Sequence, residues 1–439
     1  VIADIPGTWY AKGPASYLSP EEAQDYHDLI EWAGVQPWSN GRVGTTGVSY
    51  LTSSQWRVAA TRPPHLVAIN PWEGWTDTYR EVARHGGIPE TSFWPYIWER
   101  WGASTGEIED LERETREHPF FDEFWETKAA DLEAIEVPAF VVASWTDQGL
   151  HTRGTLEGFR RISSPEKWLH VHGAKKWAEY YRPGMVELQA RFFDHYLLGK
   201  ETGLETWPRV RVELRERYGV GEFVESTAWP LPEVGYRDLH LDAATGALSP
   251  EHVATESSVA YHGLGDPFAP SRAIFEHRFE EDTDVVGHSR LTLWAEAPEA
   301  DDMDVFVGLF KRDAAGEIVP FAYYAQFEDG PVALGWLRAS HRELDPERST
   351  DFLPVLAHRQ ELPLEQGAPT RLDIEILPSG TRFAAGESLV LVVQGHDLKH
   401  YPKPLVFSRH EDGRNRGPQV LHTGGRFDAT LTIPVRPRD

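Results

Sequence analysis

The chain has 439 residues, 40% of them hydrophobic, and a formal net charge of −26. The length exceeds that of one ordinary domain, and the acidity argues against nucleic acid or an anionic membrane as a partner. The sequence contains no cysteine, which excludes disulfides, thiolate metal sites and a cysteine nucleophile. No apolar run approaches the roughly twenty residues of a membrane span. We therefore expect a soluble protein and favour the cytoplasm as its compartment.

The first 200 residues alternate strand-like apolar runs with helical patterns, which is typical of a parallel sheet with helices on both faces. A helix is expected to begin at Ser19-Pro20, because serine is a favoured N-cap and proline a favoured first residue, and to end before Gly34. The predicted strands are Val1–Ile5, Val43–Thr46, Leu66–Asn70, Ala139–Trp145 and Trp168–His172.

A sharp turn with one serine follows the strand Val43–Thr46. Gly47 lies two residues before Ser49, and a helix is expected from about Thr52. A tight strand-to-helix turn of this kind exposes a serine hydroxyl above the sheet, and small residues flank it because the turn is strained. Leu51 is not small, so the match to G-x-S-x-G is partial. These residues alone leave an ordinary strand–helix turn equally open.

The surrounding sequence is more specific. It contains Asp28-Leu29-Ile30-Glu31-Trp32, Gln36-Pro37-Trp38-Ser39-Asn40-Gly41 and Gly47-Val48-Ser49-Tyr50-Leu51. It resembles the serine hydrolases grouped with cocaine esterase, the α-amino-acid ester hydrolases and the X-prolyl dipeptidyl peptidases, and the resemblance extends over nearly the whole chain. The resemblance implies an α/β-hydrolase catalytic domain with a helical cap, followed by a C-terminal jelly roll.

The same resemblance implies several strands before Val1, together with a loop whose tyrosine hydroxyl supplies one oxyanion-hole group. A chain that begins at Val1 would lack that donor. Losing one such donor costs about 10²–10³ in rate, so we expect a fragment of this kind to be nearly inactive.

We expect residues 1–200 to form the catalytic domain. Aromatic residues are concentrated between about residues 72 and 130, on predicted helices that would form the cap of this domain. Most of these rings are expected to be helix core. A minority should line a substrate pocket, because pockets are largely apolar. The substrate-binding candidates are Trp72, Trp75 and Trp94.

A serine nucleophile needs a base, and that base needs an acid to fix its tautomer. Asp147 directly follows the strand Ala139–Trp145, in a segment similar to the acid-bearing segment of the family. On an α/β-hydrolase sheet the chain order is serine, acid, histidine, which makes Asp147 the predicted triad acid for Ser49. The backbone N–H of Tyr50, the residue after the nucleophile, is the predicted oxyanion-hole donor.

The histidine departs from the family pattern, which would place it where this sequence has Trp177. We predict His172 as the base, because it ends a strand from which a loop can return its ring to the nucleophile. His170, deeper in the same strand, is the second candidate. His151 is expected to lie too close to the acid in sequence to pair with it easily.

Residues 201–439 contain short alternating runs separated by turns, which predict a β-sandwich domain. The runs are Val210–Leu214, Asp238–Leu241, Ser289–Trp294, Val305–Val307, Leu372–Ile376, Ser388–Val393 and Ala429–Ile433. Asp301-Asp302-Met303-Asp304 lacks the glutamate and glycine of a calcium-binding loop, so a solvated turn is predicted there. With no phosphate loop or dinucleotide fingerprint, neither a cofactor nor a metal is expected.

These patterns predict a serine hydrolase that cleaves a carboxylic ester, or else an amide, of a small molecule through an acyl-enzyme. One alternative is an X-prolyl dipeptidyl peptidase or α-amino-acid ester hydrolase, which must bind an α-ammonium group and for which Glu73, Asp77 and Glu90 are the candidate carboxylates. An alternative of another class is a non-catalytic binding protein with a degenerate triad. The sequence leaves homo-oligomerisation open.

Overall fold

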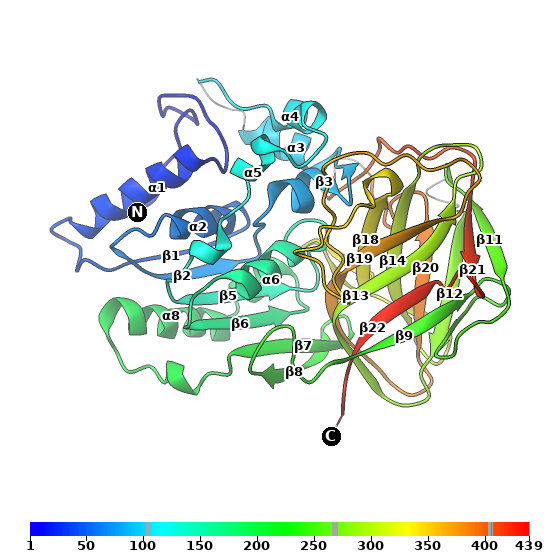
Figure 1. Cartoon of the computed structure of the whole chain (residues 1–439). Helices are drawn as coiled ribbons and strands as arrows, with labels where there is room; N and C mark the ends of the chain where they lie inside the picture. Colours follow the sequence, from blue (N-terminus) through cyan, green and yellow to red (C-terminus); the bar gives the residue numbers. More distant parts are fainter. Residues whose placement is uncertain (102–105, 266–270, 403–404, 406, 439) are drawn as a thin grey trace. The chain divides into compact units, whose positions relative to one another are not determined.

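The computed structural model describes residues 1–101, 106–265, 271–402, 405 and 407–438 (Figure 1). The chain forms two compact units. The first comprises Val1–Ala83, Ser92–Val212 and Phe223–Pro232, and the second Arg84–Thr91, Glu213–Glu222 and Glu233–Asp439. The expected domain boundary near residue 200 remains a prediction. Arg84–Thr91, which precedes that boundary, belongs to the second unit, and Phe223–Pro232, which follows it, belongs to the first.

A parallel sheet forms the centre of the first unit. Its strands lie in the order β1, β2, β5, β6, β7, and each neighbouring pair is parallel. They are β1 (Val43–Val48), β2 (Leu66–Trp72), β5 (Ala139–Ser144), β6 (Lys167–His172) and the first part of β7 (Val210–Arg217). β2 and β5 are buried along nearly their whole length, as expected for strands of a parallel sheet whose two faces are both covered by helices.

Helices cover both faces of this sheet. Thr45 of β1 donates to Gln55 of α2 (Tyr50–Ala60) over 3.1 Å. At the preceding residue, Gly44, a Cβ atom would approach Phe193 of α8 (Pro183–Leu198) to 2.7 Å. Successive strand residues face opposite sides, so α2 and α8 pack on opposite faces. The other helices that flank the sheet are α1 (Pro20–Gly34), α6 (Thr152–Arg161) and α7 (Lys176–Tyr180).

Two predictions near the start of the chain have different outcomes. The N-cap of α1 is confirmed, because Ser19 Oγ accepts from Glu22 N at 3.1 Å while the Glu22 carboxylate reaches back to Leu18 N. The strand expected at Val1–Ile5 is wrong: this run carries no ladder hydrogen bonds. An apolar run forms a strand only where another strand pairs with it.

The cap region consists of short helical segments: a π-helix (Tyr79–Ala83), α3 (Phe93–Trp101), α4 (Leu111–Glu117), α5 (Glu123–Thr127) and a 3₁₀ turn (Leu132–Ala134). Tyr79 and Trp125 are fully buried with ring centroids 5.6 Å apart, and Phe121 and Phe124 pack against them. These rings are helix core, as expected for most of the aromatic residues in this region.

The second unit is made of antiparallel strands around an apolar core. Neighbouring strands pair in the order β9, β22, β13, β19, β18, β14, β20, β12, β10 and back to β9. The sheet therefore closes into a barrel-like ring. Two of its contacts, β18–β19 and β10–β12, consist of one pair of residues each. The predicted runs in this part of the chain are strands. The jelly-roll connection implied by the family resemblance is not confirmed and stays a prediction.

The strands of the ring are β9 (Gly235–Asp242), β10 (Ala247–Ser249), β12 (Arg272–Arg278), β13 (Thr283–Glu296), β14 (Asp304–Arg312), β18 (Ala333–Arg338), β19 (Thr370–Phe383), β20 (Ser388–Gln394) and β22 (Thr430–Arg436). Others are β3 (Arg84–His85), β4 (Ile88–Pro89), β8 (Val220–Ser226), β11 (Ser257–His262), β15 (Ile318–Val319), β16 (Phe321–Tyr323), β17 (Phe327–Gly330) and β21 (Pro418–Thr423). Two further 3₁₀ turns are Leu204–Thr206 and Ala339–His341.

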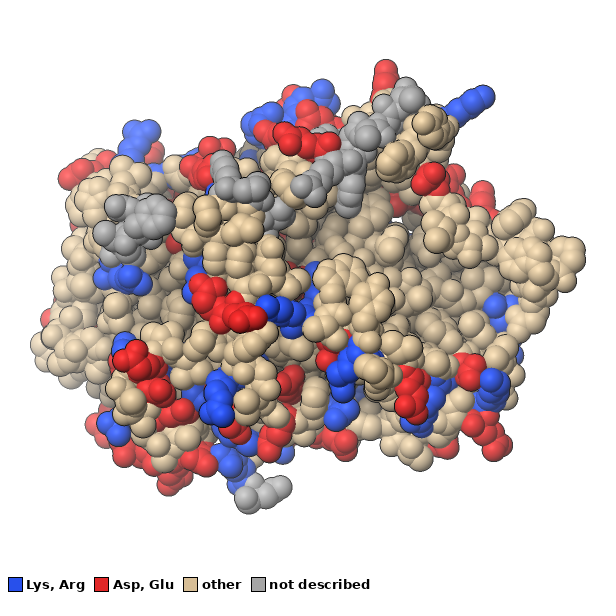
Figure 2. Space-filling model, turned by 180° about the vertical axis from the view of Figure 1, so that it is seen from behind, with Lys and Arg blue, Asp and Glu red and all other residues tan. Residues whose placement is uncertain are grey.

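Charged side chains of both signs are interspersed on the face drawn in Figure 2. Such mixing leaves no broad field of one sign on that face to attract a polyanion. Within the described part of the chain, no helix combines the length and apolarity needed to span a bilayer.

Candidate active site

Ser49 lies on a strained turn between β1 and α2. Its main-chain φ is 65° and ψ is −119°, so the turn at the serine is strained, as the sequence predicts. A non-glycine residue adopts this conformation only where its surroundings impose it. Ser49 N donates to the Glu73 carbonyl at 2.9 Å, which ties the turn to the end of β2. The serine itself is half-buried.

Close packing explains which small residues the elbow needs. A Cβ atom at Gly47 would lie 2.4 Å from Leu51 Cβ, so the residue two before the serine must be glycine. Leu51 itself is 61% exposed, which is why a large residue is accepted there. Thr52 secures the turn from below, donating to Gly47 O at 2.7 Å and accepting from Trp72 N at 2.8 Å.

The histidine beside the serine is His151. Its Nε2 is 3.0 Å from Ser49 Oγ, and its Nδ1 is hydrogen-bonded to Asp147 Oδ2. The expectation that His151 lies too close to Asp147 in sequence is therefore wrong. His151 is the N-cap of α6, its backbone N donates to Asp147 O at 3.0 Å, and residues four apart across such a turn present their side chains on one side. The Asp–x–x–x–His spacing ahead of a helix was the signal that could have found it.

The two strand histidines have other neighbours, so the placement of His172 beside Ser49 is also wrong. His172 Nε2 is 3.2 Å from Glu73 Oε1. His170 Nε2 lies 3.6 Å from Glu179 Oε1, and burial lowers the pKa of His170 to about 4. Both residues are on β6, and their side chains are held inside the unit by carboxylates from other segments.

The pKa values of Asp147 and His151 both differ from those of free side chains. Asp147 is 1% and His151 0% exposed. Burial alone would raise the pKa of Asp147, but Lys176 and then His151 outweigh it, so the pKa lies below its ordinary value and the group is a carboxylate at neutral pH. Burial, and next the Lys176 ammonium, lower the pKa of His151, while Asp147 and Glu73 oppose this. His151 is therefore a neutral base near pH 7.

Glu73 is a second buried carboxylate near the histidines. It follows β2 directly, has a φ of 43° and is 0% exposed. Its Oε2 accepts from Ser144 Oγ at 2.7 Å, while Oε1 faces His172. Non-glycine residues with positive φ concentrate at functional sites, where the surrounding structure holds the strain.

The three predicted substrate-binding tryptophans lie in different surroundings. Trp72 is in the core under the sheet, fully buried and bonded through Nε1 to Asn70 Oδ1 at 3.0 Å, so a role in contacting substrate is not supported. Trp75 and Trp94 are also buried, at 1% and 4% exposed, but they lie beside His151: Trp75 stacks on the His151 ring with centroids 5.6 Å apart, and Trp94 meets Trp75 edge-on at 6.2 Å. Among the described residues, Trp75 Nε1 has no hydrogen-bond partner.

Tyr50 directly follows Ser49 and is the first residue of α2, so its N–H lies at the positive end of the helix. Its hydroxyl donates to Glu22 at 2.6 and 2.7 Å from the two carboxylate oxygens. Burial and the Glu22 charge raise the pKa of Tyr50, which keeps it a neutral donor. The side chain anchors the helix start and with it the backbone N–H predicted for the oxyanion hole.

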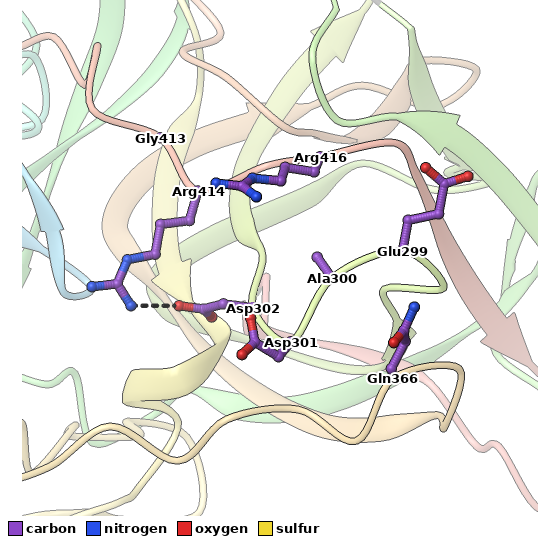
Figure 3. A pocket seen from close by; sticks show the side chains of 8 residues that line it. All are labelled: Glu299, Ala300, Asp301, Asp302, Gln366, Gly413, Arg414 and Arg416. Atoms are coloured by element: carbon purple, nitrogen blue, oxygen red, sulfur yellow. Dashed lines mark hydrogen bonds and ion pairs between the residues drawn. The ribbon is translucent and has the colours of Figure 1, made fainter.

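The Asp301–Asp304 run does not form the solvated turn that was predicted. It borders a hollow of about 570 Å³ in the second unit, where Arg414 bonds to Asp302 at 3.1 Å (Figure 3). Asp302 also accepts from Ser340 N at 2.9 Å. Asp304 is fully buried and paired with Arg338 at 2.7 Å. Only Asp301 is exposed. The described residues contain no group of three or more potential ligands placed to hold a metal ion.

Comparisons with known proteins agree with this architecture. Residues 202–432 match the family model of the X-Pro dipeptidyl-peptidase C-terminal non-catalytic domain, and residues 1–106 match that of the X-Pro dipeptidyl-peptidase (S15 family). A CocE/NonD family hydrolase from Staphylococcus aureus superposes with a TM-score of 0.94 at 42% identity, covering 97% of this chain and 77% of that one.

More distant relatives at 16–26% identity include esterases and an ester hydrolase. Cocaine esterase from Rhodococcus is 26% identical over 62% of this chain, and the chain spans only 57% of that relative's length. A putative serine esterase from Mycobacterium tuberculosis is 22% identical, covering 87% of this chain and 76% of the relative. An α-amino acid ester hydrolase, at 16% identity and a TM-score of 0.70, shares the fold over 94% of this chain and 80% of its own. The chain thus belongs to the serine hydrolase family that includes cocaine esterase and the X-Pro dipeptidyl-peptidases.

Proposed function

We propose that the protein is a serine hydrolase that cleaves carboxylic esters of small molecules through an acyl-enzyme. The observation that carries this proposal is the 3.0 Å contact between Ser49 Oγ and His151 Nε2 on a strained strand–helix turn. Ser49 and Asp147 keep the roles expected from the sequence, and His151 replaces His172 as the base. The names of the esterases among its relatives support the same reaction class.

The geometry supports a double displacement. Ser49 Oγ attacks the ester carbonyl while His151 Nε2 takes the hydroxyl proton, and the Tyr50 N–H stabilises the oxyanion. His151 then returns the proton to the leaving alcohol. In the second half the same nitrogen takes a proton from a water molecule, whose oxygen attacks the acyl carbonyl; the bond to Ser49 Oγ breaks, the acid product leaves, and His151 returns the proton to Ser49 Oγ. Asp147 accepts a hydrogen bond from Nδ1–H throughout, which fixes the tautomer whose Nε2 lone pair faces the serine.

The carboxylates weighed for an α-ammonium site are engaged elsewhere. Asp77 is paired with Arg80 at 2.7 Å, and Glu90, in the second unit, accepts from Arg409 N at 3.1 Å. Glu73 faces Ser144 and His172 inside the sheet. This arrangement favours a simple ester over an aminoacyl substrate. Trp75 and Trp94 supply the apolar surface for its bulky group, and the second unit, which we expect to be a jelly roll, contributes none of the proposed catalytic groups.

A fluorophosphonate probe tests the proposal on the full-length protein. Because it reacts only with an activated serine, we expect one covalent adduct, mapped by peptide mass spectrometry to Ser49. Ser49→Ala should lose the adduct and hydrolysis of a p-nitrophenyl ester, with its melting temperature nearly unchanged. Ser54→Ala, which removes a hydroxyl from the same helix, should keep both. An unlabelled Ser49 in folded protein would favour the non-catalytic alternative.

A further inference from the structure

Lys176 is a buried cation that contacts both partners of the proposed catalytic pair. It is the first residue of α7 and is 5% exposed. Its Nζ forms an ion pair with Asp147 Oδ2 and lies 2.9 Å from His151 Nδ1. A triad of serine, histidine and acid requires no such group, so the presence of a lysine at this position calls for a separate explanation.

The position of the hydrogen on the His151 ring limits which hydrogen bonds Lys176 can donate. Nδ1 of a neutral imidazole either carries a hydrogen or accepts one. If Nδ1 accepted from Lys176, the hydrogen would lie on Nε2, and His151 could not take a proton from Ser49. The Asp147 carboxylate, which accepts from Nδ1, selects the productive tautomer. The lysine hydrogens are therefore directed to Asp147, and the ammonium charge is left beside the edge of the imidazole.

We propose that Lys176 is a positioning residue that holds Asp147 in place and keeps His151 in its neutral form at acidic pH values where an ordinary histidine is protonated. This inference rests on the proposed role of His151 as the base. A cation next to the ring repels the proton that would otherwise sit on it, and it neutralises part of the aspartate charge that would attract that proton. The site would then keep working as the medium becomes mildly acidic.

The groups around His151 set the balance. Asp147 from its own turn and Glu73 from the end of β2 favour the imidazolium, while Lys176 from α7 and burial oppose it. Ser49 faces Nε2, and the Trp75 ring covers one flat side of the imidazole and keeps water away. Because burial and then Lys176 are the largest influences, the pKa of His151 lies below its ordinary 6.5. With the cation removed, burial alone would oppose the two buried carboxylates that favour the imidazolium.

The kinetic test is the pH profile of kcat/KM for an ester with a pH-independent assay. In wild type the acid limb should lie below pH 6.5, the ordinary value for histidine. Lys176→Met should move that limb upward by about one pH unit, in line with the removal of one neighbouring charge. Lys176→Arg should restore it, because the charge returns. Lys175→Met, which removes the adjacent cation at the start of the same helix, should leave it unchanged.

A second measurement does not depend on turnover. Protein with ¹³C-labelled histidine, with the His151 signal assigned by its loss in His151→Asn, gives the His151 titration by NMR in each variant. We expect a midpoint below 6.5 in wild type and a rise of about one unit in Lys176→Met or, if that variant does not fold, in Lys176→Gln. An unchanged midpoint in either folded variant, or a wild-type midpoint at or above 6.5, would overturn the role of Lys176. Absent labelling of Ser49 would overturn only the proposed reaction.

Discussion

Each of the two units contains a buried ionic cluster. The two clusters differ in whether their hydrogen bonds end inside the protein or continue to a half-buried side chain. In the second unit, Arg338 binds both oxygens of Asp304, at 2.7 and 2.9 Å, and the Arg414 N–H adds a third contact to this carboxylate at 2.7 Å. In the first unit, Asp147 likewise has two partners, His151 and Lys176. His151, however, continues outward through Nε2 to the half-buried Ser49 hydroxyl.

The difference shows what separates a structural cluster from a reactive one. A guanidinium with a carboxylate has no proton to give near neutral pH, and its hydrogen bonds end within the protein. An imidazole can accept a proton on one nitrogen while the other stays bonded to its acid. Buried charge alone is therefore a poor guide to function. A titratable group that joins the cluster to an accessible nucleophile is a better one.

The largest effect should come from changing the proposed base. His151→Gln should lower kcat/KM of the full-length protein by about 10⁴-fold or more, because loss of the base in a triad leaves only binding and oxyanion catalysis. His172→Gln, in the same unit, should change it by less than about tenfold, since that ring faces Glu73. Steady-state kinetics on variants with checked melting temperatures decide between them. The reverse order of effects would return the base to His172.

An intermediate effect, on stability, should come from the structural cluster. Asp304→Asn leaves Arg338 buried without its carboxylate, which costs about 3–5 kcal/mol of the free energy of unfolding of the second unit. The fluorophosphonate labelling rate of the protein that remains folded should not change. Asp301→Asn, at the exposed end of the same run, should alter stability by at most about 0.5 kcal/mol. Denaturant unfolding followed together with labelling separates the two quantities. A slower labelling rate without loss of stability would contradict the division of roles.

The smallest effect should be on substrate choice. Trp75→Ala or Trp94→Ala should weaken kcat/KM for a benzoyl ester relative to an acetyl ester by about tenfold, because lost apolar contact penalises the larger group. Trp72→Phe, a change within the core, serves as the matched control and should leave the ratio alone. Competition between the two esters measures the ratio directly. Equal losses for both esters in both variants would assign Trp75 and Trp94 to the cap core.

Local sequence was sufficient for much of the fold. Gly47 before Ser49 predicted the strained turn, because only a residue without Cβ fits against Leu51. The Ser19 cap and the apolar run before Asp147 likewise predicted a helix start and a strand end, since the deciding interactions lie within a few residues. The period-two runs after residue 201 predicted strands, because the alternation of apolar and polar residues is itself visible in a short stretch of sequence. At Val1–Ile5 this reasoning failed, because a strand also needs a partner from elsewhere in the chain.

Which histidine lies beside Ser49 was decided only by tertiary structure. His151 comes in the loop after β5, and His172 is the last residue of β6. Neither position in the sequence reveals which ring turns toward Ser49. The choice was made by packing: Glu73 engages His172 from the end of β2, Trp75 stacks on His151, and Lys176 and Asp147 hold its Nδ1. These partners come from segments up to about a hundred residues apart, and burial makes their charges act strongly on one another. The residue types of the proposed site were therefore readable in the sequence, but the histidine that lies beside Ser49 was set by contacts that form only in the folded unit.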